Sequence, residues 1–406
     1  MVHQTISTSS ASAPSDSRRN QIMYRLPWRI WRCVASALIV GMLWGCASAP
    51  SPPPAEVPAA LPGDNGPLPP ALQHGISRWV PVRWAALPGF AQDSLYEAWN
   101  AWIKSCERPG PVFAPLCGDV RRLSIATGEE QRAWMMQHLQ PYRVEPASGA
   151  PAGGLLTGYY EPLFDASRVP RPGYSVPLYS PPAGLRSGRP WYTRQQIDTL
   201  PEARAALRGH EIAYLTSPID ALILQIQGSG RLRMTEPDGS QHLVRLSFAG
   251  TNDQPYKSVG RWLLDQGATR DATWPGIRAW LAQNPQRVND LLWSNPRVVF
   301  FREEPLSPLD AAFGPRGAQG VALTPGRSIA VDASSIPYGT PVWLASSGPL
   351  VNLQRLVLAQ DTGTAIVGAV RADYFAGSGP QAGELAGRLK QPLRLWVLWP
   401  KQAVVR

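Results

Sequence analysis

The sequence predicts a mainly β protein with some helices, an α+β fold, from three observations. First, the 406 residues include 43 prolines and 36 glycines but only 17% charged residues, which favours many turns and argues against a helical bundle or coiled coil. Second, 44% of the residues are hydrophobic, which is typical of a folded rather than a disordered chain. Third, helical patterns come first along the body and short strand patterns follow.

Residues 1–45 are predicted to be an export signal. Several arginines precede an apolar run over 33–45, which is too short to span a bilayer but fits the core of a signal peptide. The run ends at Leu43-Trp44-Gly45-Cys46, a pattern that resembles a bacterial lipobox, so Cys46 is predicted to be the lipidated N-terminus of the mature protein. Ordinary secretion with cleavage after one of the next alanines remains open. By analogy with bacterial lipoproteins, Ala47 after the cysteine favours an outer-membrane anchor facing the periplasm.

The next segment, residues 46–71, is rich in proline and poor in apolar residues, so it is predicted to be an extended tether. The formal net charge is +10, which suggests an anionic partner. Removal of residues 1–45 lowers this charge but leaves it positive. Because an exported protein rarely meets nucleic acid and no nucleic-acid motif occurs, we expect that partner in the cell envelope.

Two cysteines remain in the body after the signal and the lipid anchor are set aside. Cys106 and Cys117 could form a disulfide in an oxidising compartment, since prolines and a glycine between them suit a turn. Two free buried thiols are the alternative. The five histidines are scattered without ligand spacing, so no metal and no cofactor are predicted.

Apolar spacing predicts the order of elements in the body. Helical patterns occupy 93–106, 129–139, 257–265, 275–283 and 286–293. Thr127 and Glu130 form a capping-box pattern at the start of the second of these. Strand patterns occupy 155–161, 221–227, 243–248, 297–302, 328–331, 341–345, 353–359 and 393–399.

Two glutamines are candidate ligand contacts. If 221–227 is a strand, Gln225 and Gln227 point the same way, and two amides on one face suit sugar hydroxyls because each can donate and accept. A solvated strand face explains them equally well. The following Gly228-Ser229-Gly230 lacks the third glycine of a dinucleotide fingerprint, so a tight turn is favoured over a phosphate loop.

With the histidines poorly placed, carboxylates are the candidates for acid–base chemistry. Asp332 and Asp361 each follow a strand-like run, where a simple turn role remains open. Asp373 differs because alanine and two aromatic residues flank it, with no adjacent glycine or proline. Apolar surroundings raise the pKa of a carboxyl group, as would a second carboxylate nearby. A raised pKa is what a general acid needs near neutral pH.

Seven ordered motifs carry a resemblance to a known family. They are TGYYEP at 157–162, QIQGSG at 225–230, GTN at 250–252, NPRVVFF at 295–301, DASSIPYGT at 332–340, DTGTAI at 361–366 and RADYFAG at 371–377. Their order and spacing resemble the membrane-bound lytic murein transglycosylase A family over residues 72–400. The lipobox and the tether also fit that family.

The resemblance implies two β-barrel domains separated by a groove. A double-psi-type barrel would be formed by both ends of the body, 72–164 and 298–400, and would include a three-aspartate module at about 321–400. A smaller barrel would be inserted at 165–297.

The resemblance also implies the residues of the site. Asp373 would be the catalytic acid and base, with Asp361 close to it. The glycan contacts would be Thr157, Gly158, Tyr159, Gln225, Gln227, Gly228, Ser229 and Gly230, with Asp332 either a further contact or a residue that shapes the loops.

The implied reaction is cleavage of the β-1,4 bond between N-acetylmuramic acid and N-acetylglucosamine in peptidoglycan, forming 1,6-anhydromuramoyl ends without a cofactor. The partners would be glycan strands, the outer membrane and, as an open question, other cell-wall enzymes. Two alternatives remain at this point. One is a hydrolytic muramidase that uses a second carboxylate, and the other is a lipoprotein that only binds glycan.

Overall fold

The computed structural model describes residues 66–150 and 153–401. The predicted signal peptide, Cys46 and the tether up to residue 65 lie outside the described residues. Among the helices of the described part, none has the length and apolar character needed to cross a membrane.

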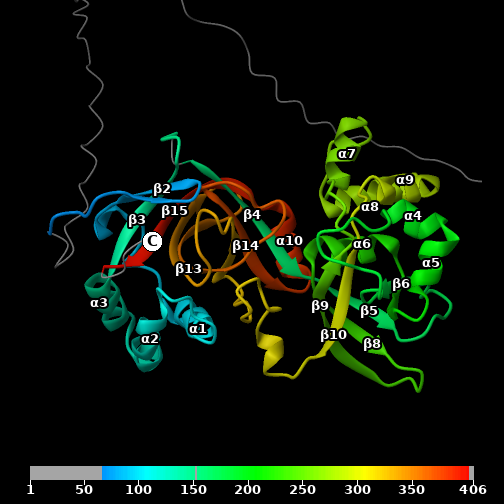
Figure 1. Ribbon diagram of the computed structural model, residues 1–406, viewed down its shortest axis with the longest axis horizontal. Helices are drawn as coiled ribbons and strands as arrows, with labels where there is room; N and C mark the ends of the chain where they lie inside the picture. The colour runs from blue at the N-terminus through cyan, green and yellow to red at the C-terminus, as the bar shows by residue number, and fades with distance from the viewer. Residues whose placement is uncertain (1–65, 151–152, 402–406) are drawn as a thin grey trace, which may run out of the picture. The chain divides into compact units, whose positions relative to one another are not determined.

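In the described part of the chain, strands form two sheets (Figure 1). The first has nine strands in the order β1-β2-β3-β15-β12-β13-β11-β14-β4. These are β1 (Leu72–His74), β2 (Ser77–Pro81), β3 (Leu139–Pro146), β4 (Gly154–Glu161), β11 (Ser328–Val331), β12 (Pro341–Ser347), β13 (Asn352–Asp361), β14 (Arg371–Ser378) and β15 (Lys390–Pro400). Strands from both ends of the body therefore pair with one another.

The long strand β15 closes this sheet into a barrel. Its first residues pair with β4, where Lys390 lies opposite Thr157, while its later residues pair with β12, where Val397 lies opposite Val342. A ring without a free edge is thus formed by six strands, β4, β14, β11, β13, β12 and β15. The predicted α+β class and the barrel are both found.

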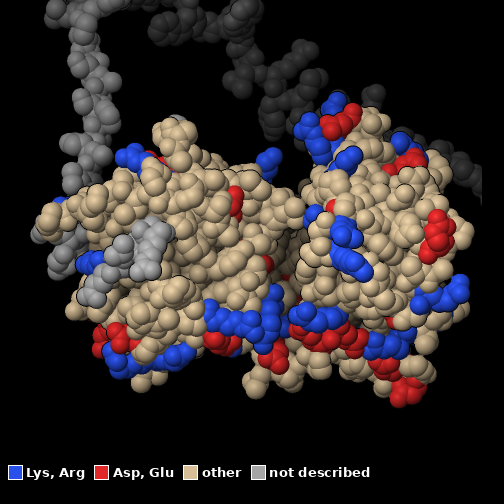
Figure 2. All heavy atoms as spheres, in the orientation of Figure 1, with Lys and Arg blue, Asp and Glu red and all other residues tan. Residues whose placement is uncertain are grey.

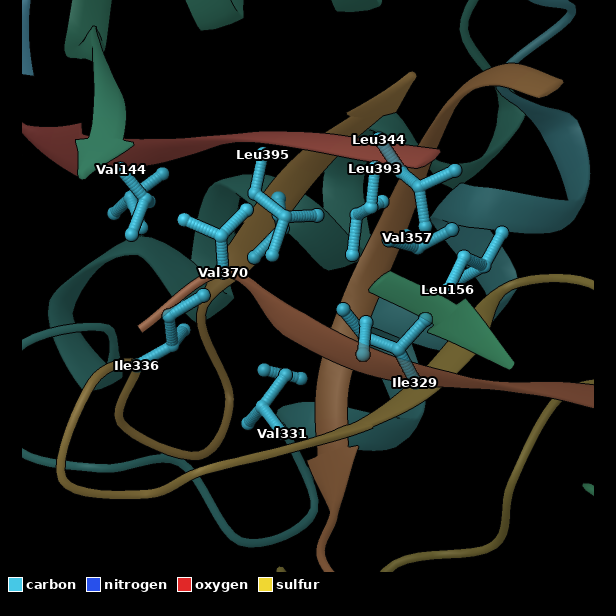
Figure 3. Packing of buried hydrophobic residues seen from close by; sticks show 14 of the residues in the cluster. Val144, Leu156, Ile329, Val331, Ile336, Leu344, Val357, Val370, Leu393 and Leu395 are labelled. Carbon is cyan, nitrogen blue, oxygen red and sulfur yellow. The ribbon is translucent and has the colours of Figure 1, made fainter. Parts of the chain in front are cut away.

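The barrel interior is a hydrophobic core. Side chains at alternating positions of the ring strands point toward one another there, as Figure 3 shows for Leu156, Ile329, Val331 and their neighbours. These three side chains are fully or almost fully buried. Residues between them in sequence face away from the core, and this alternation determines where the site forms.

The second sheet has six strands in the order β10-β9-β8-β5-β7-β6. These are β5 (Leu163–Ser167), β6 (Val176–Tyr179), β7 (Glu211–Leu215), β8 (Gly230–Thr235), β9 (Gln241–Thr251) and β10 (Val299–Pro305). The strands of this sheet are contiguous in sequence, between β4 and β11. Strand β10 follows residue 298, where the sequence predicted the barrel domain to resume, but it pairs with the strands of the inserted segment.

Helices accompany both sheets. Those before the barrel strands are α1 (Tyr96–Ser105), α2 (Cys117–Arg122) and α3 (Gly128–His138). Those of the inserted segment are α4 (Arg194–Thr199), α5 (Pro201–Leu207), α6 (Pro218–Gln227), α7 (Val259–Asp265), α8 (Trp274–Gln283) and α9 (Val288–Trp293). Helix α10 (Pro380–Arg388) lies between β14 and β15 and packs on β4 and β14. The predicted capping box of Thr127 and Glu130 is present at the start of α3.

A disulfide joins Cys106, just after α1, to Cys117, the first residue of α2. Among the alternatives open from the sequence, the structure contains the bonded pair. The bond closes a short loop that includes Arg108, and Arg121 donates a hydrogen bond of 2.7 Å to the carbonyl of Cys106.

One predicted strand is wrong. Residues 221–227 form the C-terminal part of helix α6, not a strand. The apolar run fits a buried helix as well as a buried strand, and tertiary packing against α7, α8 and α9 buries its apolar side chains. Pro218 at the first helical turn and Gly228 in the left-handed conformation after the last turn mark the ends of this helix. Gln225 and Gln227 therefore do not share a strand face.

The two sheets are tied together by a buried ionic cluster. Glu161, the last residue of β4, accepts hydrogen bonds of 2.6 Å from Arg231 of β8 and from Arg245 of β9. Ser378 of β14 donates a third hydrogen bond of 2.7 Å to the same carboxylate. Both arginines also donate to the carbonyl of Phe313. The Glu161 side chain is fully buried, so these donors replace all of its water.

We expect the substitution Glu161→Gln to destabilise the fold strongly. The amide keeps the size of the side chain but leaves two buried guanidinium groups without a counter-charge, which costs about 3–5 kcal/mol. Chemical denaturation of both proteins measures the loss. The control is Glu107→Gln, which breaks the exposed pair with Lys104 and should cost less than about 1 kcal/mol. Equal losses in the two variants would contradict the role of the cluster.

Candidate active site

A cavity of about 870 Å³ lies between residues of the two sheets. Strands β4, β11, β13 and β14 contribute one part of its lining, and helix α6 and strands β9 and β10 contribute another. Of the residues predicted for the site, it is lined by Thr157, Gly158, Tyr159, Gln225, Gln227, Gly228, Ser229, Asp361 and Asp373. The fold thus brings together residues that are more than 200 positions apart in sequence.

The centre of the cavity is a row of residues in register across four neighbouring strands. Ala330 of β11 lies opposite Asp361 of β13 on one side and opposite Asp373 of β14 on the other. Asp373 in turn lies opposite Thr157 of β4. The sequence neighbours of these residues, such as Ile329 and Ala372, point into the barrel core. Alternation therefore turns the whole row toward the cavity.

A β-bulge sets the position of Asp361. Pairing between β11 and β13 shifts by one residue after Ile329, so that Gln360 and Asp361 both lie beside Ala330. The Gln360 side chain is buried and donates hydrogen bonds of 2.8 Å to the Ala101 carbonyl and to the Ser105 hydroxyl of α1. The bulge lets one strand present an amide to α1 and a carboxylate to the cavity.

The carboxylate of Asp373 has a single hydrogen-bond donor. The Thr157 hydroxyl donates to its Oδ1 atom, and the Arg371 guanidinium donates to the Thr157 oxygen at 2.8 Å. Because arginine can only donate, the hydroxyl proton of Thr157 must point to Asp373. Burial raises the pKa of Asp373, while the bond from Thr157 and the charge of Arg371 oppose that rise. In the protonated acid, Oδ2 is the oxygen left to carry the proton.

Asp361 has three donors instead of one. Its Oδ1 atom accepts from the backbone N–H groups of Ala318 and Thr362, and its Oδ2 atom accepts from the Tyr159 hydroxyl, all at 2.9 Å. Burial nevertheless raises the pKa of Asp361 to about 6, with a smaller contribution from the charge of Asp373. Burial and the neighbouring carboxylate of Asp361 raise the pKa of Tyr159 well above its usual value, so its hydroxyl group stays protonated and donates. Asp361 is therefore ionised at neutral pH.

The two aspartates do not play the same electrostatic part. They share no hydrogen bond in the described structure, and burial rather than repulsion by Asp361 accounts for the raised pKa of Asp373. Of the two causes that the sequence suggested for a raised pKa, apolar surroundings and a second carboxylate, burial is the one that acts on Asp373. The geometric difference is that one oxygen of Asp373 has no donor among the described residues, whereas both oxygens of Asp361 accept hydrogen bonds.

The two glutamines reach the cavity from the last turn of α6. The Gln225 side-chain oxygen accepts a hydrogen bond of 2.6 Å from Arg194, and that of Gln227 accepts one of 3.1 Å from the backbone N–H of Tyr160. Since each oxygen is engaged, each amide NH₂ is left as a donor. Gly228 ends the helix with a φ of 78°.

Two predicted contacts lie elsewhere. Asp332 is absent from the cavity lining, and its carboxylate accepts from Ser334 at 3.0 Å and from the backbone of Gly368 at 2.9 Å. This geometry favours the loop-shaping role. Gly230 is also outside the lining, and an added Cβ would lie 2.0 Å from the Leu224 side chain. Its role in this structure is close packing of β8 on α6.

Sequence reasoning missed Ala330 and Arg371. The period of two along β14 could have found Arg371, because it shares a strand face with Asp373. No sequence signal marks Ala330, which belongs to the site because it pairs with Asp361 on one side and with Asp373 on the other. Within the described residues, no three His, Cys, Asp or Glu side chains come together as a metal-binding group.

Two family models match the chain. The model described as the MltA specific insert domain matches residues 155–302, and the 3D domain model matches residues 327–399. The membrane-bound lytic murein transglycosylase A of Escherichia coli strain K12 is 34% identical over 319 residues, which cover 76% of each chain. The chain belongs to this family.

Solved structures agree with this membership. A lytic transglycosylase of Burkholderia pseudomallei, LtgG, is 45% identical with a TM-score of 0.57, covering 81% of this chain and 97% of that one. The Escherichia coli family member MltA with bound chitohexaose is 26% identical with a TM-score of 0.62, covering 81% of this chain and 93% of that one.

We expect Thr157→Val to change the pH dependence of the family's reaction in this protein. Loss of the donated hydrogen bond removes a stabiliser of ionised Asp373, so its pKa rises and the alkaline limb of kcat/KM moves to higher pH. The rate at the optimum falls because the carboxyl group loses its orientation. Thr157→Ser keeps the hydroxyl and should keep the profile. An alkaline limb that stays in place or moves down in the valine variant would refute this role.

Proposed function

We propose that this protein is a lytic transglycosylase that cleaves the β-1,4 bond between N-acetylmuramic acid and N-acetylglucosamine in peptidoglycan. The observation that carries the proposal is the unequal hydrogen bonding of two aspartates in one cavity. Asp373 has one donor and an oxygen without a donor that can carry a proton, while both oxygens of Asp361 accept hydrogen bonds from three donors in all. This asymmetry supports Asp373 as the proton donor, and we assign both proton transfers to it in place of the acid and base pair of ordinary glycosidases.

In the first step, protonated Asp373 gives its proton to the glycosidic oxygen as the bond from that oxygen to C1 of the muramoyl residue breaks. Burial favours the protonated form because it raises the pKa of this carboxyl group. Positive charge develops on C1 and the ring oxygen. The departing N-acetylglucosamine keeps the transferred proton on its new hydroxyl group.

In the second step, the substrate supplies its own nucleophile. The C6 hydroxyl of the same muramoyl residue attacks C1 and gives its proton to the Asp373 carboxylate. The product is a 1,6-anhydromuramoyl end, no water is consumed, and Asp373 is protonated again. Attack within one sugar gains from proximity, so a second catalytic carboxylate is unnecessary.

Asp361 serves as a fixed negative charge in this scheme. With its pKa raised to about 6, it is ionised at neutral pH and stabilises the positive charge that develops on the sugar ring. The hydrogen bonds from Tyr159, Ala318 and Thr362 keep it in place through the reaction. The side-chain amides of Gln225 and Gln227 are suited to hold the sugar hydroxyls on the opposite wall.

We also propose the cellular setting and the domain division. Export by residues 1–45, lipidation of Cys46 and the tether 46–71 would hold the enzyme at the outer membrane, facing the periplasm. The disulfide between Cys106 and Cys117 supports an oxidising compartment. The division into a barrel domain, 72–164 and 298–400, and an inserted domain, 165–297, is supported in outline by the separate strand pairing of the two sheets, although β10 (Val299–Pro305) pairs with the inserted sheet.

Asp373→Asn should abolish release of anhydromuropeptides from purified sacculi. The amide cannot donate an acid proton, so we expect a loss of about 10²–10⁴-fold in rate. Mass spectrometry of the digests beside the wild-type protein measures the product, and circular dichroism checks the fold. Anhydro products from the folded variant would refute the proposal. Reducing muramic acid ends from the wild-type protein would instead indicate a hydrolytic muramidase.

Asp361→Asn should lower kcat by about 10²-fold while binding of glycan persists, because the stabilising charge is lost but the amide fits the same place. The acidic limb of the wild-type pH profile should lie near the pKa of Asp361, about 6, since activity falls as this group becomes protonated. The variant should lose that limb. A variant that retains it would show that another group titrates there.

A further inference from the structure

Two arginines that line the cavity converge on one glycine. Arg108 and Arg316 both contribute to the lining, and both are exposed. Arg316 donates a hydrogen bond of 3.1 Å to the carbonyl oxygen of Gly320. Arg108 lies against the same residue, since a Cβ built on Gly320 would be 2.9 Å from its Nη1 atom. Both guanidinium groups thus contact one residue of the cavity lining.

Neither arginine forms an ion pair with a carboxylate of the described residues. On the face that Figure 2 shows, basic and acidic side chains are interspersed. The nearby acids already have partners, since Glu107 pairs with Lys104 at 2.8 Å and Glu304 pairs with Arg302 at 2.8 Å. Two guanidinium groups that contact the same residue and have no counter-charge repel one another, and an anion bound to both would relieve that cost.

The backbone around the pair is well fixed. The Arg108 carbonyl accepts a hydrogen bond of 3.2 Å from Gln319, and Arg108 lies in the loop closed by the disulfide. The Gln319 side chain also contacts Ser105 of α1 at 3.1 Å. The same segment donates the N–H of Ala318 to Asp361. The pair is therefore held in a constant relation to the cavity floor.

We propose that Arg108 and Arg316 form a carboxylate-binding subsite for the muramoyl side chains of the glycan. This inference rests on the proposed function, because it takes the glycan strand as the occupant of the cavity. A muramoyl residue carries a lactyl group that ends either in a free carboxylate or in a peptide stem with carboxylates of its own. Guanidinium groups bind carboxylates through paired hydrogen bonds, which gives the site a preference for muramoyl glycan over neutral chitin.

The test measures binding in the Asp373→Asn background, so that the glycan is not consumed. Three probes of equal sugar length distinguish the sources of charge. They are a muramoyl oligosaccharide with peptide stems, the same oligosaccharide with its stems removed so that only lactyl carboxylates remain, and chitohexaose, which has no carboxylate. Isothermal titration calorimetry gives the Kd for each probe at low and at high ionic strength.

We expect the Asp373→Asn protein to bind at least one muramoyl probe about tenfold more tightly than chitohexaose. Adding Arg108→Gln and Arg316→Gln should reduce this preference to about twofold or less, and Arg→Lys at both positions should restore part of it. Higher salt should weaken the preference. The muramoyl probe whose preference over chitohexaose is lost in the double variant shows whether the arginines bind the lactyl carboxylate or a carboxylate of the peptide stem.

The matched control changes Arg186 and Arg270 to Gln, which removes the same net charge from exposed positions outside the cavity lining. This control should keep the full preference. The inference is overturned if the background protein shows no preference, if the preference survives the Arg108 and Arg316 changes, or if the control loses as much. Failure of all three probes to bind would overturn the proposed function as well.

Discussion

Alternation of side chains along a β-strand is the constraint on which the site depends. The ring strands of the barrel must bury every second residue, such as Leu156, Ile329 and Ala372, to make a core. The residues between them therefore face away from the core. On four neighbouring strands, those outward residues include Thr157 and Asp373. The same packing that stabilises the barrel therefore aligns the polar groups of the cavity.

Burial raises the pKa of Asp361 and of Asp373, and the hydrogen bonds that each carboxylate accepts lower it. The balance of these two effects differs between the two acids. Both lose water in the cavity floor, which raises both pKa values. Three donors hold Asp361 near a pKa of about 6, while Asp373 has one. The buried cluster of Glu161 and two arginines joins β4 to the second sheet, so the wall opposite these acids stays in place.

Much of this could be predicted from the sequence, and the omissions have physical reasons. The helices before the barrel and the strands that lead to Asp332 and Asp361 followed from local patterns, and the apolar neighbours of Asp373 predicted its raised pKa. Strand β14, which carries Asp373, was not among the predicted strands. Helix α6 was predicted as a strand because a short apolar run has no clear period, although Pro218 and Gly228 mark its ends. Ala330 and the pairing of Arg108 with Arg316 depend on register and on contacts between distant segments, which no local pattern encodes.

The bulge at Gln360 has a consequence for sequence variation. One amide from this residue fills the space between the barrel and the backbone of α1 at Ala101, which is fully buried. A change in α1 that moves the Ala101 carbonyl or the Ser105 hydroxyl would disturb the hydrogen bonds of that amide and, with them, the bulge that places Asp361. Sequence variation on this face of α1 is therefore coupled to the site, even though no residue of α1 lines the cavity.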